Sequence, residues 1–205
     1  HLALGVRDRS DSTVDIHCFD GWSATKSECQ EALSQTGITI EPFEDTLPRV
    51  QATLSPFQVP IHYLKGNVSN AKWEGRQISV YVDDASKGPK TFFHVLKTFA
   101  PYWIPGKTVV VLMDYYYWKK LKGWRAAEYR CQQSFIERHP DHFAVIKDFR
   151  DGFQVPFSNE AFRYVKALDF ATLRAESMPL SLRRLIPTPI SAMTQRVLSR
   201  MGFDV

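Results

Sequence analysis

Residues 76–118 read RQISVYVDDASKGPKTFFHVLKTFAPYWIPGKTVVVLMDYYYW, in which two β-branched apolar runs flank a segment with helical spacing. The first run, 78–82, ends at Asp83, and the second run, 108–113, ends at Asp114. Two such runs joined by a helix predict neighbouring parallel strands. The two acids then fall at the carboxyl ends of the strands, where open α/β sheets bind their ligands.

The same alternation of strand and helix signals continues on both sides of this segment. Further parallel strands are expected at 14–19 and 61–65, and an antiparallel pair near 144–148 and 162–168. Helices are expected at 25–36, 47–54, 91–102 and 124–138. The pattern predicts an α/β fold with a Rossmann-like sheet that is mostly parallel and closes with a C-terminal antiparallel hairpin.

Composition is ordinary for a globular domain, since 44% of the 205 residues are hydrophobic and 23% are charged. The expected organisation is one domain over 1–175 and a basic amphipathic tail over 176–205. A net charge of +4 without a long Lys/Arg block argues against nucleic acid, and no apolar run approaches the ~20 residues of a membrane span. Three cysteines without a CxxC pair favour reduced thiols in a cytoplasmic protein.

Two short motifs follow the first two predicted strands. Phe19-Asp20-Gly21-Trp22 follows 14–19, and Gly66-Asn67-Val68 follows 61–65. As an ordered set with the acidic turns further along, they resemble the class I S-adenosylmethionine-dependent methyltransferases. Within that class the chain is similar to the macrocin O-methyltransferase-like group, which methylates sugar hydroxyls, over roughly residues 14–170.

The resemblance implies S-adenosylmethionine as cofactor and assigns residues to it. Asp20, with Trp22 beside it, would bind the ribose hydroxyls, because an ionised carboxylate can accept both hydrogen bonds of a vicinal diol. Asn67 would meet the adenine edge, Val68 would pack on the ring, and Asp83 would border the cofactor. Each motif alone is also an ordinary turn sequence.

The resemblance further implies a divalent cation held by acids after the fourth and fifth strands. Asp83 and Asp114 match the outer two of those acids, but Ala85 and Met113 stand where further carboxylates would be. Mg²⁺ would therefore have few protein ligands. The two acids are expected to orient and deprotonate the acceptor hydroxyl, directly or through a cation; the alternative is that they are solvated turn acids.

Other candidate residues lie near the same strand ends. His94, early in the helix after Asp83, could act as a general base, and Tyr115, Tyr116 and Trp118 could shape an acceptor pocket. A helix-surface or core histidine and a well-filled aromatic core are the alternatives. The other histidines are scattered along the sequence, and the close pair His139 and His142 is interpreted as two solvated loop residues.

A Gly-rich turn, with which methyltransferases of this class begin, does not occur before Asp20. Either the first strand precedes His1 in a longer chain, or the cofactor site has been lost. Two functions stay open: an O-methyltransferase acting on a small-molecule or glycan acceptor, and a catalytically degenerate methyltransferase-like module that binds a partner. The sequence also leaves open whether the protein is a homo-oligomer.

Overall fold

The computed structural model describes residues 14–146 and 159–169 of the chain. The chain divides into two compact units between Ala71 and Lys72. The expected basic tail at 176–205 lies outside the described residues. Among the described residues, no helix combines the length and apolar character that crossing a membrane requires.

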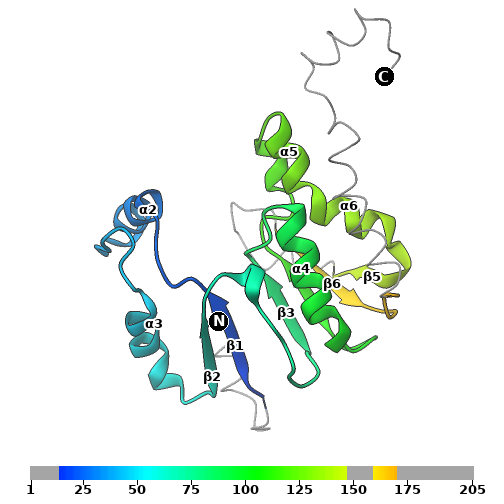
Figure 1. Cartoon of the computed structure of the whole chain (residues 1–205), viewed down its shortest axis with the longest axis horizontal. Coiled ribbons are helices and arrows are strands. Elements are labelled where there is room, and N and C mark those ends of the chain that lie inside the picture. Colours follow the sequence, from blue (N-terminus) through cyan, green and yellow to red (C-terminus); the bar gives the residue numbers. More distant parts are fainter. Residues whose placement is uncertain (1–13, 147–158, 170–205) are drawn as a thin grey trace, which may run out of the picture. The chain divides into compact units, whose positions relative to one another are not determined.

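The first unit contains a pair of parallel strands, β1 (Ile16–Asp20) and β2 (Ile61–Lys65), shown in Figure 1. They pair in register from Ile16 opposite Ile61 to Asp20 opposite Lys65. Between them the chain forms the helices α2 (Lys26–Thr36) and α3 (Leu47–Leu54) and the 3₁₀ turn η1 (Ser55–Phe57), and η2 (Val68–Asn70) follows β2. The predicted strands and helices of this part are confirmed.

Helix α2 was expected at 25–36, and capping interactions form at both of its ends. Thr25 and Glu28 form a capping box, in which each side chain accepts a hydrogen bond from the other residue's backbone N–H. At the other end Gly37 adopts a left-handed conformation with φ of 71°, which costs glycine little. The local sequence therefore marks both ends of this helix.

The second unit is built on a four-stranded sheet in the order β3-β4-β6-β5. Its strands are β3 (Val80–Asp83), β4 (Val109–Leu112), β5 (Phe143–Val145) and β6 (Glu160–Tyr164). β3 and β4 are parallel, and β6 is antiparallel to both β4 and β5. The predicted parallel pair and the closing antiparallel pair are confirmed, although β5 and β6 each begin one or two residues earlier than predicted.

The four strands predicted to be parallel form two parallel pairs, each described within its own unit. β1 pairs with β2 and β3 pairs with β4, as two separate ladders among the described residues. The connection from β2 to β3 carries only the three-residue turn η2.

The core of the second unit lies between its sheet and the helices α4 (Pro89–Phe99) and α6 (Cys131–Arg138), seen in Figure 1. The helical spacing of α4 buries five apolar side chains, namely Phe92, Phe93, Val95, Leu96 and Phe99. Phe135 of α6 meets Phe92 edge-on at a ring-centroid distance of 5.5 Å. The single helix predicted for 124–138 is instead two, because α5 (Trp124–Tyr129) ends before Arg130.

Three 3₁₀ turns complete the described elements of this unit. They are η3 (Ala100–Tyr102), η4 (Tyr117–Lys120) and η5 (Pro140–His142). The helix expected at 91–102 thus begins two residues earlier, with Pro89 in its first turn, and changes to η3 after Phe99. Proline suits a first helical turn because the N–H that it lacks has no intrahelical partner there.

Candidate functional site

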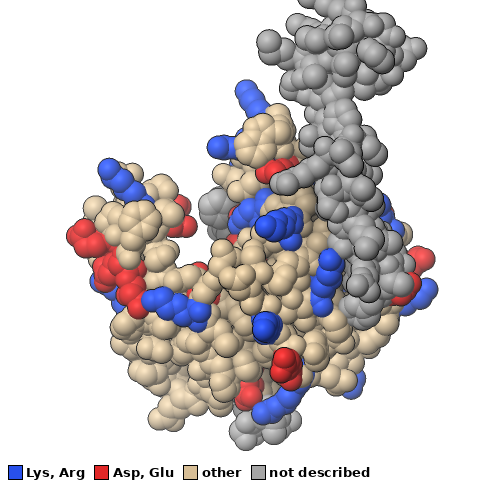
Figure 2. All heavy atoms as spheres, viewed as in Figure 1, with Lys and Arg blue, Asp and Glu red and all other residues tan. Residues whose placement is uncertain are grey.

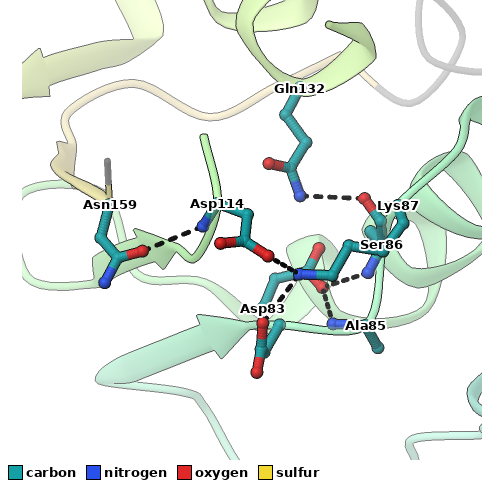
Figure 3. A network of polar contacts seen from close by, with 8 residues as sticks. Asp83, Ala85, Ser86, Lys87, Asp114, Gln132 and Asn159 are labelled. Carbon is teal, nitrogen blue, oxygen red and sulfur yellow. Dashed lines mark hydrogen bonds and ion pairs between the residues drawn. The ribbon is translucent and has the colours of Figure 1, made fainter. Parts of the chain in front are cut away.

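Asp83, the last residue of β3, is 3% exposed and faces back on its own loop (Figure 3). Its Oδ1 accepts hydrogen bonds from the backbone N–H groups of Ala85 at 3.1 Å and Ser86 at 2.9 Å. Burial raises the pKa of this carboxyl, while the hydrogen bonds from Ser86 and Ala85 and the charge of Lys87 partly offset the rise. The carboxyl group therefore shapes the β3–α4 loop at the cost of burying a charge.

Lys87 brings the acids of two strand ends together. Its Nζ lies 2.6 Å from Asp114 Oδ2, beyond β4, and 2.8 Å from Asp84 Oδ1, beyond β3. Figure 3 shows the ammonium directed at the Asp114 carboxylate. Burial lowers the pKa of Lys87, but its hydrogen bonds with these two carboxylates outweigh that effect, so the pKa lies above its usual value. The ammonium therefore stays charged and links the two strand ends.

Asp114 is held by its backbone as well as by its side chain. It has a left-handed φ of 58°, which is uncommon for a residue other than glycine. Its N–H donates to the side-chain oxygen of Asn159 at 2.9 Å, just before β6. From α6, Gln132 donates to the carbonyl oxygen of Ser86 at 3.2 Å (Figure 3). Contacts from four elements of the second unit thus hold the acidic edge in place.

The arrangement of these acids does not fit a Mg²⁺ site. Mg²⁺ requires several oxygen ligands in near-octahedral geometry. The carboxylate of Asp114 is bound to the Lys87 ammonium, and one oxygen of Asp83 is already shared by two backbone N–H groups. With Ala85 and Met113 in the remaining places, this edge offers few further carboxylate oxygens to such an ion.

The residues assigned to the cofactor lie at the carboxyl edge of β1 and β2. The N–H of Gly66 donates to the carbonyl oxygen of Asp20 at 2.9 Å, so the turns after both strands adjoin. Asp20 is exposed, and Lys65, its partner across the ladder, is bound by Asp45 at 2.7 Å instead. The Asp20 carboxylate therefore has no salt bridge within the described ranges.

Trp22 and Asn67 stabilise the turns that follow β1 and β2, respectively. The side-chain oxygen of Asn67 accepts from the N–H of Ser69 at 2.8 Å, which leaves the amide NH₂ for a ligand. Val68 is half-buried beside it. Trp22 is buried with a φ of 53°, and its ring packs on Tyr63 at a centroid distance of 5.7 Å. Because it is buried, Trp22 supports the loop and does not offer its ring face to a ligand.

The aromatic residues after β4 occupy three different environments. Tyr115 is 4% exposed and belongs to the core. Tyr116 donates its hydroxyl proton to Glu160 Oε2 at 2.9 Å. Trp118 Nε1 donates to Gln133 Oε1 at 2.6 Å, and the guanidinium of Arg130 lies 5.0 Å from the centre of its ring. The half-buried Tyr116 and Trp118 are more accessible to an acceptor than Tyr115.

His94 lies half-buried on α4, and its backbone carbonyl accepts from the Thr98 hydroxyl at 2.9 Å. The sequence did not point to Lys87, Gln132 or Asn159. The i,i+3 spacing of Asp84 and Lys87 was a usable signal. The contacts of Gln132 and Asn159 span 46 and 45 residues, so no local pattern announces them.

Charge is spread over the surface. On the face shown in Figure 2, the Lys and Arg side chains form separate groups divided by uncharged surface. Acidic side chains of the first unit lie close to some of them, as in the pairs Lys65–Asp45 and Arg49–Glu44.

Comparison with solved structures finds several methyltransferases. The O-methyltransferase NovP aligns over 80% of this chain at 12% identity with a TM-score of 0.48, and the chain spans 63% of the length of NovP. The N-methyltransferase NodS from Bradyrhizobium japonicum WM9 aligns over 80% of this chain and 93% of its own, at 10% identity and a TM-score of 0.42. DesVI from Streptomyces venezuelae aligns over 54% of this chain and 47% of its own, at 24% identity and a TM-score of 0.27.

No model of a protein family matches the chain, and neither does any curated protein. The structural matches have TM-scores below 0.5, so they do not assign the family or the activity. The chain has a mixed α/β fold with an open sheet. The case for its function rests on its own residues.

Proposed function

We propose that this chain contributes to an S-adenosylmethionine-dependent methyltransferase that methylates a hydroxyl of a sugar or sugar-containing metabolite. The observation that carries the proposal is the edge formed by Asp20 and Asn67, whose turns adjoin at the carboxyl ends of two parallel strands. Ligands of open α/β sheets bind at such edges. An exposed carboxylate without a salt bridge in the described ranges and an available amide NH₂ fit a ribose diol and an adenine edge.

Bound S-adenosylmethionine would supply an electrophilic methyl group on a sulfonium. In this proposal Asp20 accepts the two ribose hydrogen bonds, Asn67 donates to adenine, and Val68 packs against the ring. In the second unit, Asp114 and the Lys87 ammonium form a polar pair that can accept from and donate to an acceptor hydroxyl. Asp83 shapes the loop that carries Lys87, and His94 stays a candidate base.

Cofactor binding is the direct test of this proposal. Calorimetric titration of the full chain with S-adenosylmethionine should give saturable binding. Asp20→Asn should weaken it, because two charge-assisted hydrogen bonds contribute on the order of 2–4 kcal/mol together. Asp45→Asn is the matched control, since it removes an exposed acid of the same unit that is already bound to Lys65. Equal affinities for the two variants would remove the support for this cofactor site.

Transfer itself is tested with tritiated S-adenosylmethionine and a panel of hexose and deoxyhexose acceptors. Asp114→Asn should abolish labelling of the acceptor while leaving cofactor affinity unchanged. Full activity of this variant would exclude a catalytic role for Asp114. The small-molecule or glycan acceptor, the cytoplasmic location and the lack of nucleic-acid binding stay predictions.

The second candidate function is a degenerate methyltransferase-like module that binds a partner. One observation favours it: Lys87 binds the acid at the end of β4, so that carboxylate is already paired. If the wild-type chain shows no saturable binding of S-adenosylmethionine, the binding module is favoured over the methyltransferase.

A further inference from the structure

Two histidines that are 45 residues apart in the sequence face each other across the first strand pair. His17 of β1 and His62 of β2 are direct partners in the parallel ladder. Their rings stack with centroids 4.3 Å apart and planes 14° apart. Side chains two residues apart lie on the same face of a strand, so Asp15 joins them on that face. The pairing of β1 with β2 thus brings Asp15, His17 and His62 together, although His62 is distant from the other two in the sequence.

The three side chains offer metal-ligating atoms at close range. One ligand atom from each of Asp15, His17 and His62 can be chosen so that all three lie within 4.8 Å of one another. His62 Nε2 is already 3.9 Å from Asp15 Oδ2. Both imidazoles are exposed and the Asp15 side chain is 23% exposed, so an ion can reach the cluster from solvent. Among the described residues this is the one such group of three.

We propose that Asp15, His17 and His62 bind a divalent transition-metal ion of the Zn²⁺ or Cu²⁺ class. Two imidazole nitrogens and one carboxylate oxygen suit these ions, whereas Mg²⁺ and Ca²⁺ favour sets made of oxygen alone. The stacked rings turn about their Cβ–Cγ bonds to direct one nitrogen each towards Asp15. This torsion is broad for histidine, so the rotation is an easy one. Water completes the coordination.

The site is separate from the proposed cofactor edge. Asp20 lies three residues beyond His17 on β1, so the alternation of the strand directs its side chain to the opposite face. The metal would join β1 to β2 through one ligand on each strand and Asp15 just before β1. A ligand that binds only the folded strand pair stabilises it by mass action. The proposal therefore does not depend on methyl transfer.

The experiment is a titration of the tag-free full chain, freed of metal, with Zn²⁺ in competition with a chromophoric chelator. Wild type should bind one ion in this site. His17→Gln, His62→Gln and Asp15→Asn should each weaken binding at least about tenfold, since even the loss of an outer partner of a metal site typically costs 10- to 100-fold. His142→Gln is the control, from a histidine pair with centroids 5.7 Å apart that forms no group of three ligands with other described residues.

The electron paramagnetic resonance spectrum of the Cu²⁺-loaded chain gives an independent readout. It should show coupling to two imidazole nitrogens in wild type and to one in His17→Gln or His62→Gln. Because both rings are exposed, far-UV circular dichroism should be unchanged, and His17→Asn repeats the test with a shorter side chain. Equal affinity of wild type and all variants would mean adventitious surface binding and overturn the site, as would no saturable binding or a full effect of His142→Gln.

Discussion

Replacing Asp83 by Ala should destabilise the second unit by about 1–3 kcal/mol, whereas Asp83→Asn should not. In the Ala variant, the backbone N–H groups of Ala85 and Ser86 lose their hydrogen-bond acceptor, the Asp83 carboxylate. The N–H of Ser86, which is 2% exposed, loses its acceptor without access to water, and such a loss costs about 1–3 kcal/mol. The N–H of Ala85 belongs to an exposed residue and can bind water, so it adds little. Asparagine keeps an acceptor for both groups and removes the buried charge.

The pH dependence of the same variants follows from the raised pKa of Asp83. The folded protein binds this proton more tightly than the unfolded chain, whose Asp pKa is about 3.9. Wild-type stability from this group is therefore fully present below that pKa and is lost as pH rises through the folded pKa. The stability of Asp83→Asn relative to wild type should grow over that interval and then level off.

The assay is urea unfolding followed by far-UV circular dichroism, at pH 4 and at pH 7. Other carboxyl groups titrate alike in wild type and variant, so the difference between them isolates position 83. If Asp83→Asn proves as unstable as Asp83→Ala at pH 7, or if the difference from wild type is the same at both pH values, the buried charge does not have the effect inferred here.

Three further substitutions test single contacts by the same urea assay. Thr25→Ala should cost about 0.5–2 kcal/mol by removing the N-cap of α2, and Thr25→Ser should restore most of it. Tyr116→Phe should cost about 1–3 kcal/mol, because Glu160 is 1% exposed and loses a donor. Lys87→Met should cost about 1–2 kcal/mol, since it leaves a partly buried carboxylate without its countercharge. Lys90→Met, in an exposed position on α4, is its control, and equal stability of the two Met variants would mean that the Lys87 ammonium is solvated.

The elements that could be predicted are those whose signals are local. The β-branched runs before Asp83 and Asp114 were predicted to be parallel strands, because a short β-branched apolar segment between turn residues is a local strand signal. Thr25 and Gly37 marked both ends of α2 because caps act within one helical turn.

The features that escaped prediction depend on which segments meet. The break of the expected helix at Arg130 follows no proline or glycine, so its sequence did not announce it. The contact of Lys87 with Asp114 spans 27 residues, and the meeting of His17 with His62 depends on the exact register of two strands. A shift of one residue in that register would place them on opposite faces. The roles assigned to the cofactor and acceptor residues stay predictions.

The backbone of Asp114 has a consequence for the substitutions that this position can accept. At a φ of 58°, a residue with a Cβ typically pays about 1–2 kcal/mol, and only Gly, Asn and Asp enter this region readily. A library randomised at both acids and sorted only for folded protein would therefore enrich different sets. Position 83 would keep residues that can accept two hydrogen bonds, and position 114 would admit glycine, which accepts none through its side chain. Mutational tolerance at 114 thus reports the backbone geometry together with the Lys87 contact, and a sort for activity would test the proposed role of the carboxylate in transfer.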